Sequence, residues 1–160
     1  MIQKTLVLIK PDGVQRALVG EILQRFEKVG LKIVAMKMLH VDKEFSKKHY
    51  AEHIEKPFYQ GLETMITMSP VVAMVLEGVE AIELVRKMSG ATEPKSAAPG
   101  TIRGDYSHVS YGYADNKGIG IKNVIHASAN EEDAEKEVSL WFSENEIYNY
   151  NNVNDVHTRE

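Results

Sequence analysis

The segment 119–142 constrains the fold most, because a strand, a turn and a helix follow one another in it without a linker. Its first part is apolar and predicts a short strand that ends on His126. Ser128 and Glu131 have the spacing of a capping box, which predicts that a helix begins there. A buried stripe then recurs at helical period, at Ala134, Val138, Trp141 and Phe142. The segment therefore predicts one strand–turn–helix unit around which the chain is organised.

Glu137 lies three residues after Ala134 and four before Trp141, so it falls on or beside the stripe. A carboxylate at such a position is partly desolvated and needs a partner, and His126 is the candidate in the same segment. A histidine held by a carboxylate at a strand end can serve as a general base, a metal ligand or a nucleophile. Taken alone, the segment favours a structural histidine that caps the strand, so the rest of the chain must decide.

Apolar periodicity predicts the other elements. Strands are expected at 2–9, 31–40 and 71–76, and helices at 22–29, 43–55, 58–68 and 79–88. With the last strand and helix, the order βαββαβ predicts an α+β fold, a ferredoxin-like sandwich. In it, helices pack on one face of a four-stranded antiparallel sheet.

Three stretches carry no such period. The loop 91–104 is long for a compact domain, and such loops are usually functional or form an interface. Residues 106–118 are polar and tyrosine-rich and are interpreted as an insertion, whereas 143–160 is interpreted as a C-terminal tail with frayed last residues. The whole span 1–160 is expected to form a single domain.

Composition excludes several classes of protein. The chain has 160 residues and no cysteine, so it has no disulfide framework and no cysteine-based zinc site. No apolar run reaches membrane-spanning length, and the first run is cut by Lys10-Pro11 too early for a signal peptide, so a cytoplasmic protein is expected. A net charge of −4 argues against a general nucleic-acid binder, but it does not exclude a small anionic ligand.

Three cations stand at element ends or in loops: Lys10, Arg86 and Arg103. Each alone is interpreted as a surface cation, but together with the loop around Thr92 they can clamp a polyphosphate. The chain has no P-loop motif, so a nucleotide would be held in another way. Phe58 can be a core residue or a stacking face, and the pattern alone favours the core.

A competing motif is His49-Tyr-Ala-Glu52-His53, which matches the H-x-x-E-H pattern of inverted zinc peptidases. Both histidines fall on one helical face. The pattern is short and lacks an obvious third ligand, so a surface helix with two histidines is the favoured interpretation.

Six motifs follow one another along the chain: Lys10-Pro-Asp-Gly-Val-Gln-Arg16, His49-Tyr50, Lys56-Pro-Phe58, Gly90-Ala-Thr92, Ala98-Pro-Gly-Thr-Ile-Arg-Gly-Asp105 and Asn123-Val-Ile-His126-Ala-Ser128. Taken together, and in this order from about Thr5 to Phe142, they closely resemble those of the nucleoside diphosphate kinase family. The resemblance implies a ferredoxin-like protomer in a hexamer or tetramer. It also implies transfer of the γ-phosphoryl group of ATP or another triphosphate to a nucleoside diphosphate, through a phosphohistidine.

The resemblance also implies roles for single residues. His126 matches the nucleophile, with the phosphoryl group on Nδ1, and Glu137 matches the carboxylate on the other ring nitrogen. Ser128 matches a hydroxyl neighbour of that carboxylate, and Tyr50 a residue near the transferred phosphate. The nucleotide-binding positions are matched by Lys10, Arg86, Thr92 and Arg103 at the phosphates, Asn123 (with Lys10) at the ribose, and Phe58 at the base.

Chemistry agrees with these implied roles. A free imidazole has a pKa near 6.5, so much of it is an uncharged nucleophile at neutral pH. Phosphoryl transfer needs positioning and charge neutralisation, here from the cations and from Mg²⁺ held chiefly by the phosphates. Stacking on Phe58 would read a ring face rather than base edges, which predicts low base selectivity.

The chain departs from the family pattern in two places. His126-Ala127-Ser128-Ala129 replaces the usual His-Gly-Ser-Asp, so one acidic neighbour is missing. The interval from Arg103 to His126 is also longer than usual, and the family's second base contact falls in it and is not placed.

Three alternatives remain beside the kinase. A ferredoxin-like RNA-binding module would need sheet aromatics and a basic face, which the sequence does not show. A zinc hydrolase would use His49 and His53. A catalytically weak family member that acts as an oligomeric nucleotide-binding scaffold is the last, and Ala129 favours it slightly.

Overall fold

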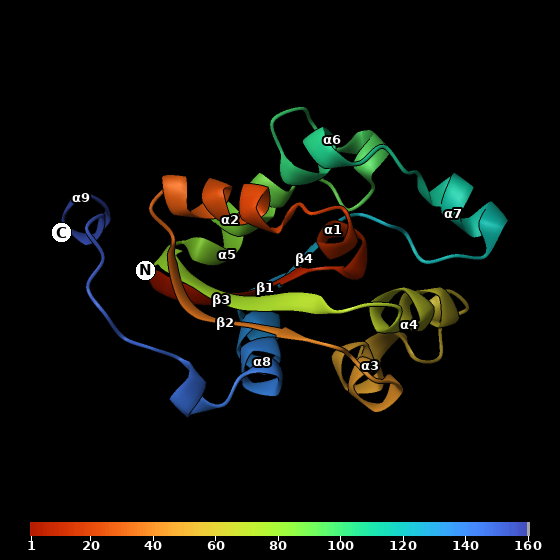
Figure 1. Cartoon of the computed structure of the whole chain (residues 1–160), viewed down its shortest axis with the longest axis horizontal. Coiled ribbons are helices and arrows are strands. Elements are labelled where there is room, and N and C mark those ends of the chain that lie inside the picture. The colour runs from red at the N-terminus through yellow and green to blue at the C-terminus, as the bar shows by residue number, and fades with distance from the viewer. Residues whose placement is uncertain (160) are drawn as a thin grey trace.

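The computed structural model describes residues 1–159 and is built around one four-stranded sheet (Figure 1). The strands are β1 Ile2–Ile9, β2 Lys32–Leu39, β3 Val71–Val79 and β4 Ile125–Ala127. Their order is β2-β3-β1-β4, and each neighbouring pair is antiparallel. The predicted α+β, ferredoxin-like sheet is therefore confirmed.

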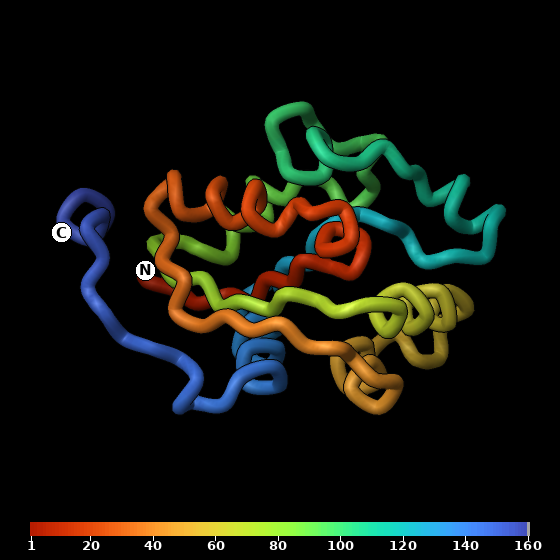
Figure 2. The backbone as a smooth tube through the Cα atoms, viewed as in Figure 1, coloured from red at the N-terminus to blue at the C-terminus, as the bar shows by residue number. Residues whose placement is uncertain are grey.

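Helices cover both faces of this sheet. They are α1 Pro11–Gln15, α2 Val19–Lys28, α3 Lys43–His49, α4 Tyr59–Thr67, α5 Ala81–Ser89, α6 Ile102–Tyr106, α7 Tyr111–Lys117, α8 Glu131–Trp141 and α9 Asp155–Thr158. In Figures 1 and 2, α2, α5 and α6 lie on one side of the strands, and α8 and α3 on the other. The expectation of helices on one face was wrong.

The reason lies in β1, whose residues Leu6 to Ile9 are all fully buried. Successive side chains of a strand point to opposite faces. Val7 and Ile9 thus enter the core under α2 and α5, whereas Leu6 and Leu8 enter a second core that holds Trp141 of α8. A strand that is apolar on both faces requires a cover on both.

Two element boundaries differ from the sequence prediction. The helix expected over 43–55 ends at His49 and continues as a separate turn of 3₁₀-helix, Ala51–His53. The cap of α8 is Asn130, whose side chain accepts a hydrogen bond from the backbone N–H of Asp133. Ser128 was expected to cap this helix but is fully buried instead, where its side chain serves the site described below.

The stretches 106–118 and 143–159 both contain helical structure. Residues 106–118 contain α7, and the chain then returns along α4 with Gly120 against Gly61: a Cβ added to Gly61 would lie 2.7 Å from the Gly120 nitrogen. The expected frayed tail instead holds α9, where Asp155 pairs with Lys32 of β2 at 2.9 Å and Arg159 with Glu77 of β3 at 2.6 Å.

Within residues 1–159, no helix combines the length and the apolar character needed to cross a membrane.

Candidate active site

The site is centred on His126 in β4, which lies against the second turn of α8. The Nε2 atom of His126 is 3.0 Å from both carboxylate oxygens of Glu137. Ser128 donates its hydroxyl to Glu137 Oε2 at 2.6 Å and accepts the backbone N–H of Leu6 at 3.3 Å. The buried hydroxyl ties the carboxylate to the central strand, so Glu137 is held in place from two sides.

These contacts determine which nitrogen of the His126 ring carries the proton. Burial opposes the charge of Glu137, but its hydrogen bonds to His126 and Ser128 outweigh that effect, and the pKa of Glu137 lies below its ordinary value. An ionised carboxylate can only accept hydrogen bonds, so Nε2 carries the proton. A neutral ring with Nε2–H leaves the lone pair on Nδ1, which is the nucleophilic atom.

His49 forms a second contact of the His126 ring, and Trp141 in turn contacts His49. The His49 ring meets the His126 ring edge to face, with centroids 4.8 Å apart. Trp141 donates its indole N–H to His49 Nδ1 at 3.2 Å, so the proton of a neutral His49 lies on Nε2. Burial, with the charge of His126 second, lowers the pKa of His49 to about 3, and the ring stays neutral.

Sequence reasoning missed this role of His49, because the H-x-x-E-H pattern was interpreted as a surface helix. The structure does not assemble that pattern into a metal site. Among residues 1–159, the one group of three metal-ligating side chains is His49, His126 and Glu137, without Glu52 or His53. Two of its three members already hold each other in a hydrogen bond.

Lys10 and Asn123 come together at the end of β1. Lys10 Nζ donates to Asn123 Oδ1 at 2.7 Å and to the Ile121 carbonyl at 3.1 Å. Burial lowers the pKa of Lys10 to about 8, with the charge of Asp12 acting the other way and that of Arg103 adding to the lowering. Asn123 also donates to the Thr92 carbonyl at 2.8 Å, which brings the long loop to the same place.

Arg103 joins this group from α6. Its guanidinium donates to three backbone carbonyls, those of Gly90, Asn123 and Ile125. Burial, and then the charge of Arg86, lowers its pKa to about 10, so it is still charged at neutral pH. The charge of Arg103 affects the pKa of Lys10 and the charge of Arg86 affects the pKa of Arg103, so the three cations lie near one another. Their binding to phosphates stays a prediction.

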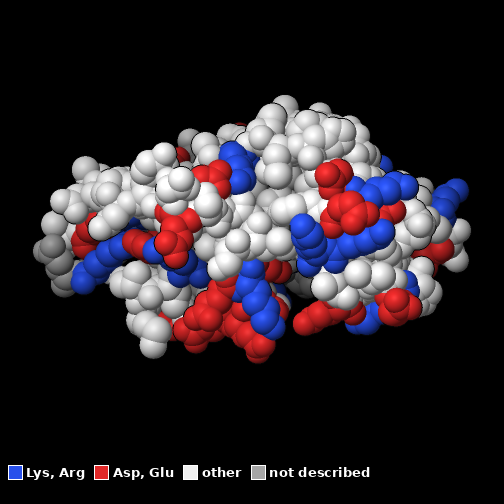
Figure 3. Space-filling model, turned by 90° about the horizontal axis from the view of Figure 1, so that it is seen from below, with Lys and Arg blue, Asp and Glu red and all other residues white. Residues whose placement is uncertain are grey.

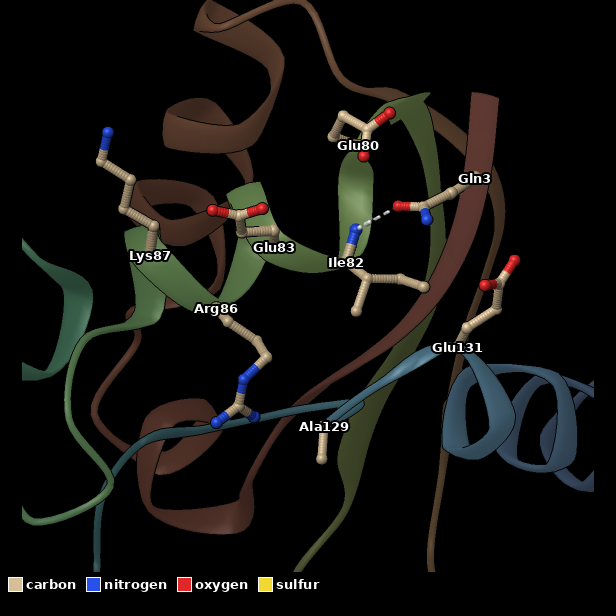
Figure 4. Close-up of a pocket in the computed structure, with 8 residues that line it drawn as sticks. All are labelled: Gln3, Glu80, Ile82, Glu83, Arg86, Lys87, Ala129 and Glu131. Carbon is tan, nitrogen blue, oxygen red and sulfur yellow. Dashed lines mark hydrogen bonds between the residues drawn. The ribbon is translucent and has the colours of Figure 1, made fainter. Parts of the chain in front are cut away.

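Arg86 itself lines a hollow of about 500 Å³ between α5 and the start of α8 (Figure 4). In the close-up its guanidinium points toward β4, and Glu83 and Lys87 point away from it. Ala129 lines this hollow and also the cleft of about 270 Å³ that contains His126. The two cavities therefore meet at Ala129, where the side chain is a single methyl group.

Tyr50 lines the cleft, and Phe58 lies next to it, with its ring centroid 5.6 Å from that of the lining residue His53. Phe58 is 49% exposed, so its interpretation as a core residue was wrong. Such a ring is available for stacking. The Tyr50 ring packs on His49 with centroids 4.6 Å apart, and burial raises the pKa of its hydroxyl, which keeps the phenol protonated.

Charges of both signs are mixed on the face seen from the α8 side (Figure 3). The largest group of acidic side chains lies at the lower edge of this view, and basic ones lie between and beside the acidic groups. A nucleic-acid binder would need a basic surface, and this face does not provide one.

Comparisons with known proteins place the chain beside the members of one family. The family model described as nucleoside diphosphate kinase matches residues 3–147. A nucleoside diphosphate kinase of Borreliella burgdorferi is 55% identical over 156 residues, 94% of this chain and 93% of that protein. One from Pyrococcus furiosus is 55% identical over 159 residues, 99% and 94% of the two chains.

Two solved structures are also closely similar. A transition state mimic of the Borrelia burgdorferi nucleoside-diphosphate kinase with bound vanadate and ADP has a TM-score of 0.95 at 52% identity, covering 98% of this chain and 96% of that one. A halophilic nucleoside diphosphate kinase from Halobacterium salinarum in complex with CDP has a TM-score of 0.89 at 42% identity, covering all of both chains.

Proposed function

The chain belongs to the nucleoside diphosphate kinase family, and we propose that Nδ1 of His126 carries the phosphoryl group that it transfers. The reaction moves the γ-phosphoryl group of a nucleoside triphosphate to a nucleoside diphosphate. The observation that supports this carrier is the pairing of Glu137 with Nε2, because it leaves the lone pair of a neutral ring on Nδ1.

The reaction has two half-reactions. In the first, the Nδ1 lone pair of His126 forms a bond to the γ-phosphorus, and the bond from that phosphorus to the bridging oxygen breaks, so the nucleoside diphosphate leaves. The ring then bears positive charge, which the Glu137 carboxylate stabilises across Nε2–H. In the second, a terminal oxygen of another diphosphate attacks the phosphorus and the P–N bond breaks, which restores the neutral ring.

The cations neutralise charge in both half-reactions. Lys10, Arg86 and Arg103 stand around the phosphates, with the Thr92 loop beside them, because a transferred phosphoryl group is stabilised by positioned positive charge. We assign Asn123 to the ribose, with Lys10 placed by its amide.

Two rings complete the proposed site. The half-exposed Phe58 ring supports stacking of the base, which any base can do. The Tyr50 phenol, kept protonated by burial, is a hydrogen-bond donor near the transferred group.

Mg²⁺ is proposed as the metal of the reaction and enters with the nucleotide. The ion prefers oxygen ligands, whereas the one metal-ligating group among residues 1–159 is formed of two imidazoles and one carboxylate. The described residues thus fit an ion held chiefly by the substrate phosphates. There it would neutralise phosphate charge.

The larger-scale assignments are also proposals. We expect a single domain over 1–160, with 106–118 as an insertion and 143–160 as a tail, that assembles into a homo-hexamer or homo-tetramer in the cytoplasm. Exposed Met36 and Met38 on the edge strand β2 are consistent with a subunit contact.

Labelling with radioactive ATP tests the carrier. The chain is incubated with γ-labelled ATP and Mg²⁺, and acid-labile, base-stable label on the protein is measured before and after GDP is added. Label that His126→Asn abolishes, that His157→Asn retains and that moves to GDP supports the proposal; His157 is exposed in α9 and serves as the matched control. An unlabelled chain that still binds ADP would instead favour the oligomeric scaffold.

A further inference from the structure

Val124 adopts a backbone conformation that is rare for its residue type. Its φ is 71°, and the N–H of Ile125 donates to the carbonyl of Asn123 at 2.8 Å, which closes a three-residue γ-turn. The γ-turn with positive φ is the rare and strained form, and a β-branched residue in it is an outlier. Strain of this kind persists only where surrounding contacts enforce it.

Residues 10–13 supply those contacts, although they lie more than a hundred positions earlier in the chain. The backbone N–H of Lys10 donates to the Val124 carbonyl at 2.9 Å, and the N–H of Val124 donates to Asp12 Oδ2 at 3.0 Å. Gly13 packs so closely that a Cβ on it would be 3.0 Å from the Val124 carbonyl oxygen. The backbone N–H and the backbone carbonyl of Val124 are therefore both held by residues 10–13.

The γ-turn determines the directions in which the side chains of Asn123 and His126 point. Asn123 and His126 are three residues apart, so in the regular strand that the sequence predicted they would point to opposite faces of the sheet. In the structure Asn123 contacts Lys10 and the Thr92 loop, while His126 faces Glu137, and the γ-turn separates the two. Arg103 braces the turn by donating to the carbonyls of Asn123 and Ile125.

An aspartate is an unexpected residue at a buried position whose role is only structural. Asp12 is 5% exposed, and among residues 1–159 its Oδ1 atom has no hydrogen-bond partner. A buried carboxylate with one satisfied oxygen costs stability. Its position is explained by the acceptor that it offers to Val124.

We propose that Asp12 is a positioning residue for phosphoryl transfer, because its carboxylate holds Val124 in the γ-turn that directs Asn123 and His126 toward the same nucleotide. The inference deepens the proposed function and rests on it. Asp12 acts through Val124 and touches neither substrate nor the reacting atoms.

The test compares Asp12→Ala with Asp12→Asn, whose amide oxygen can accept the same hydrogen bond. The rate of His126 phosphorylation by γ-labelled ATP is measured in a single turnover at pH 6.5, below the pKa of about 8 that Lys10 has in the parent. The charge of Asp12 raises that pKa, and both variants remove the same charge, so the comparison between them isolates the hydrogen bond. We expect Asp12→Ala to be slowed by about tenfold or more, since small misplacements of reacting groups cost up to about 100-fold. Asp12→Asn should stay within about threefold of the parent, because it preserves the turn.

Thermal unfolding of each variant is measured alongside the rate. An Asp12→Ala variant that is less stable but equally fast would overturn the proposal, and so would Asp12→Asn that is as slow as Asp12→Ala, since the charge beside Lys10 would then be what matters. If Asp12→Ala does not fold, Asp12→Asn decides in the same way: a rate within about threefold supports the proposal and a tenfold loss overturns it. Failure of the proposed function is distinguishable, because the parent chain would then take no label.

Discussion

At the scale of single residues, the chemistry of the site depends on which nitrogen of His126 carries its proton. Glu137 fixes that proton on Nε2, and Ser128 fixes Glu137 in turn. Under the proposed function, the carboxylate is therefore expected to matter for the rate and not for holding the nucleotide, whose binding we assign to the cations.

Replacing Glu137 by alanine should therefore lower the rate without weakening nucleotide binding. We expect Glu137→Ala to slow phosphorylation of His126 by roughly 100-fold, because the ring loses both its orientation and the stabilisation of its positive charge. Affinity for ADP should change by less than about threefold in an equilibrium titration. Glu135→Ala, on an exposed position of the same helix, is the control. A fall in affinity that matches the fall in rate would contradict the role given to Glu137.

Lys10 predicts how nucleotide binding depends on pH. Its pKa of about 8 means that the ammonium is charged below pH 8 and loses its proton above it. Affinity for ADP should be steady from pH 6.5 to 7.5 and then fall by up to about tenfold per pH unit above 8, as the cation is lost. Isothermal titration from pH 6.5 to 9.5 measures this. Lys10→Arg stays charged over the whole range, so an equally steep fall in that variant would contradict the assignment.

The sequence proposed a set of site residues, but it did not show what surrounds them. The pairing of His126 with Glu137 could be predicted because helical period places the acid on the buried side. Lys10, Arg86 and Arg103 stood out because they lie at element ends or in loops, and their binding to phosphates, which the resemblance implies, stays a prediction. The contact of His49 with His126 and the clamp of Asp12 on Val124 join segments that no local pattern relates. Phe58 was misread because an aromatic residue next to proline has the same pattern whether it is buried or exposed.

At the scale of elements, α3 and α8 meet behind the catalytic histidine through aromatic side chains. The Phe45 and Trp141 rings pack edge to face with centroids 4.7 Å apart, and the Trp141 indole N–H reaches His49. This packing holds the ring that in turn lies against His126.

Replacing Trp141 by phenylalanine should loosen that junction. The substitution leaves the buried Nδ1 of His49 without its donor, and such a loss costs about 1–3 kcal/mol. We expect the free energy of unfolding of Trp141→Phe to fall by about 2 kcal/mol. Trp141 is the only tryptophan of the chain, so unfolding in urea must be followed by circular dichroism. Unchanged stability would show that the indole N–H makes no net contribution there.

Elements whose apolar residues recur at a clear period were predictable. Elements whose ends are set by contacts with residues far away in the sequence were not. The span of α8 follows from its acidic first turn and apolar stripe, although its cap was placed two residues too early. β4 was expected as a strand ending on His126, but it has only three residues with His126 in the middle, because Asp12 and Lys10 hold Val124 out of the extended conformation.

At the scale of the whole molecule, the C-terminal tail lies along the outer strand β2. The N–H of Tyr148 donates to the Val34 carbonyl at 2.8 Å, and the buried Lys32 donates to the Tyr150 carbonyl at 2.7 Å. With the ion pairs of Asp155 and Arg159, these contacts join the end of the chain to β2 and β3. Its polar composition predicted fraying, because partners for its charges could not be seen from the tail alone.

Deleting residues 148–160 should therefore destabilise the folded domain. Lys32, which is 3% exposed, would lose Asp155 and the Tyr150 carbonyl and keep only Glu77 at 4.0 Å. We expect the free energy of unfolding to fall by about 2–4 kcal/mol, since removing the partner of a buried charge is costly. Denaturant titration measures the loss, and Arg159→Ala alone should cost less. A truncated domain as stable as the parent would show that the tail contributes nothing net.

The bare contact between Gly61 and Gly120 has a consequence for how this protein can be varied. It fixes the point at which the chain re-enters the body, so residues upstream of it, around α7, can be lengthened, shortened or exchanged while Lys122, Asn123 and everything after them keep their places. A foreign peptide grafted between Ala114 and Gly118 should leave the rest of the fold unchanged. A single methyl group added at Gly61 or Gly120 would instead displace the segment that leads from α7 back to Asn123.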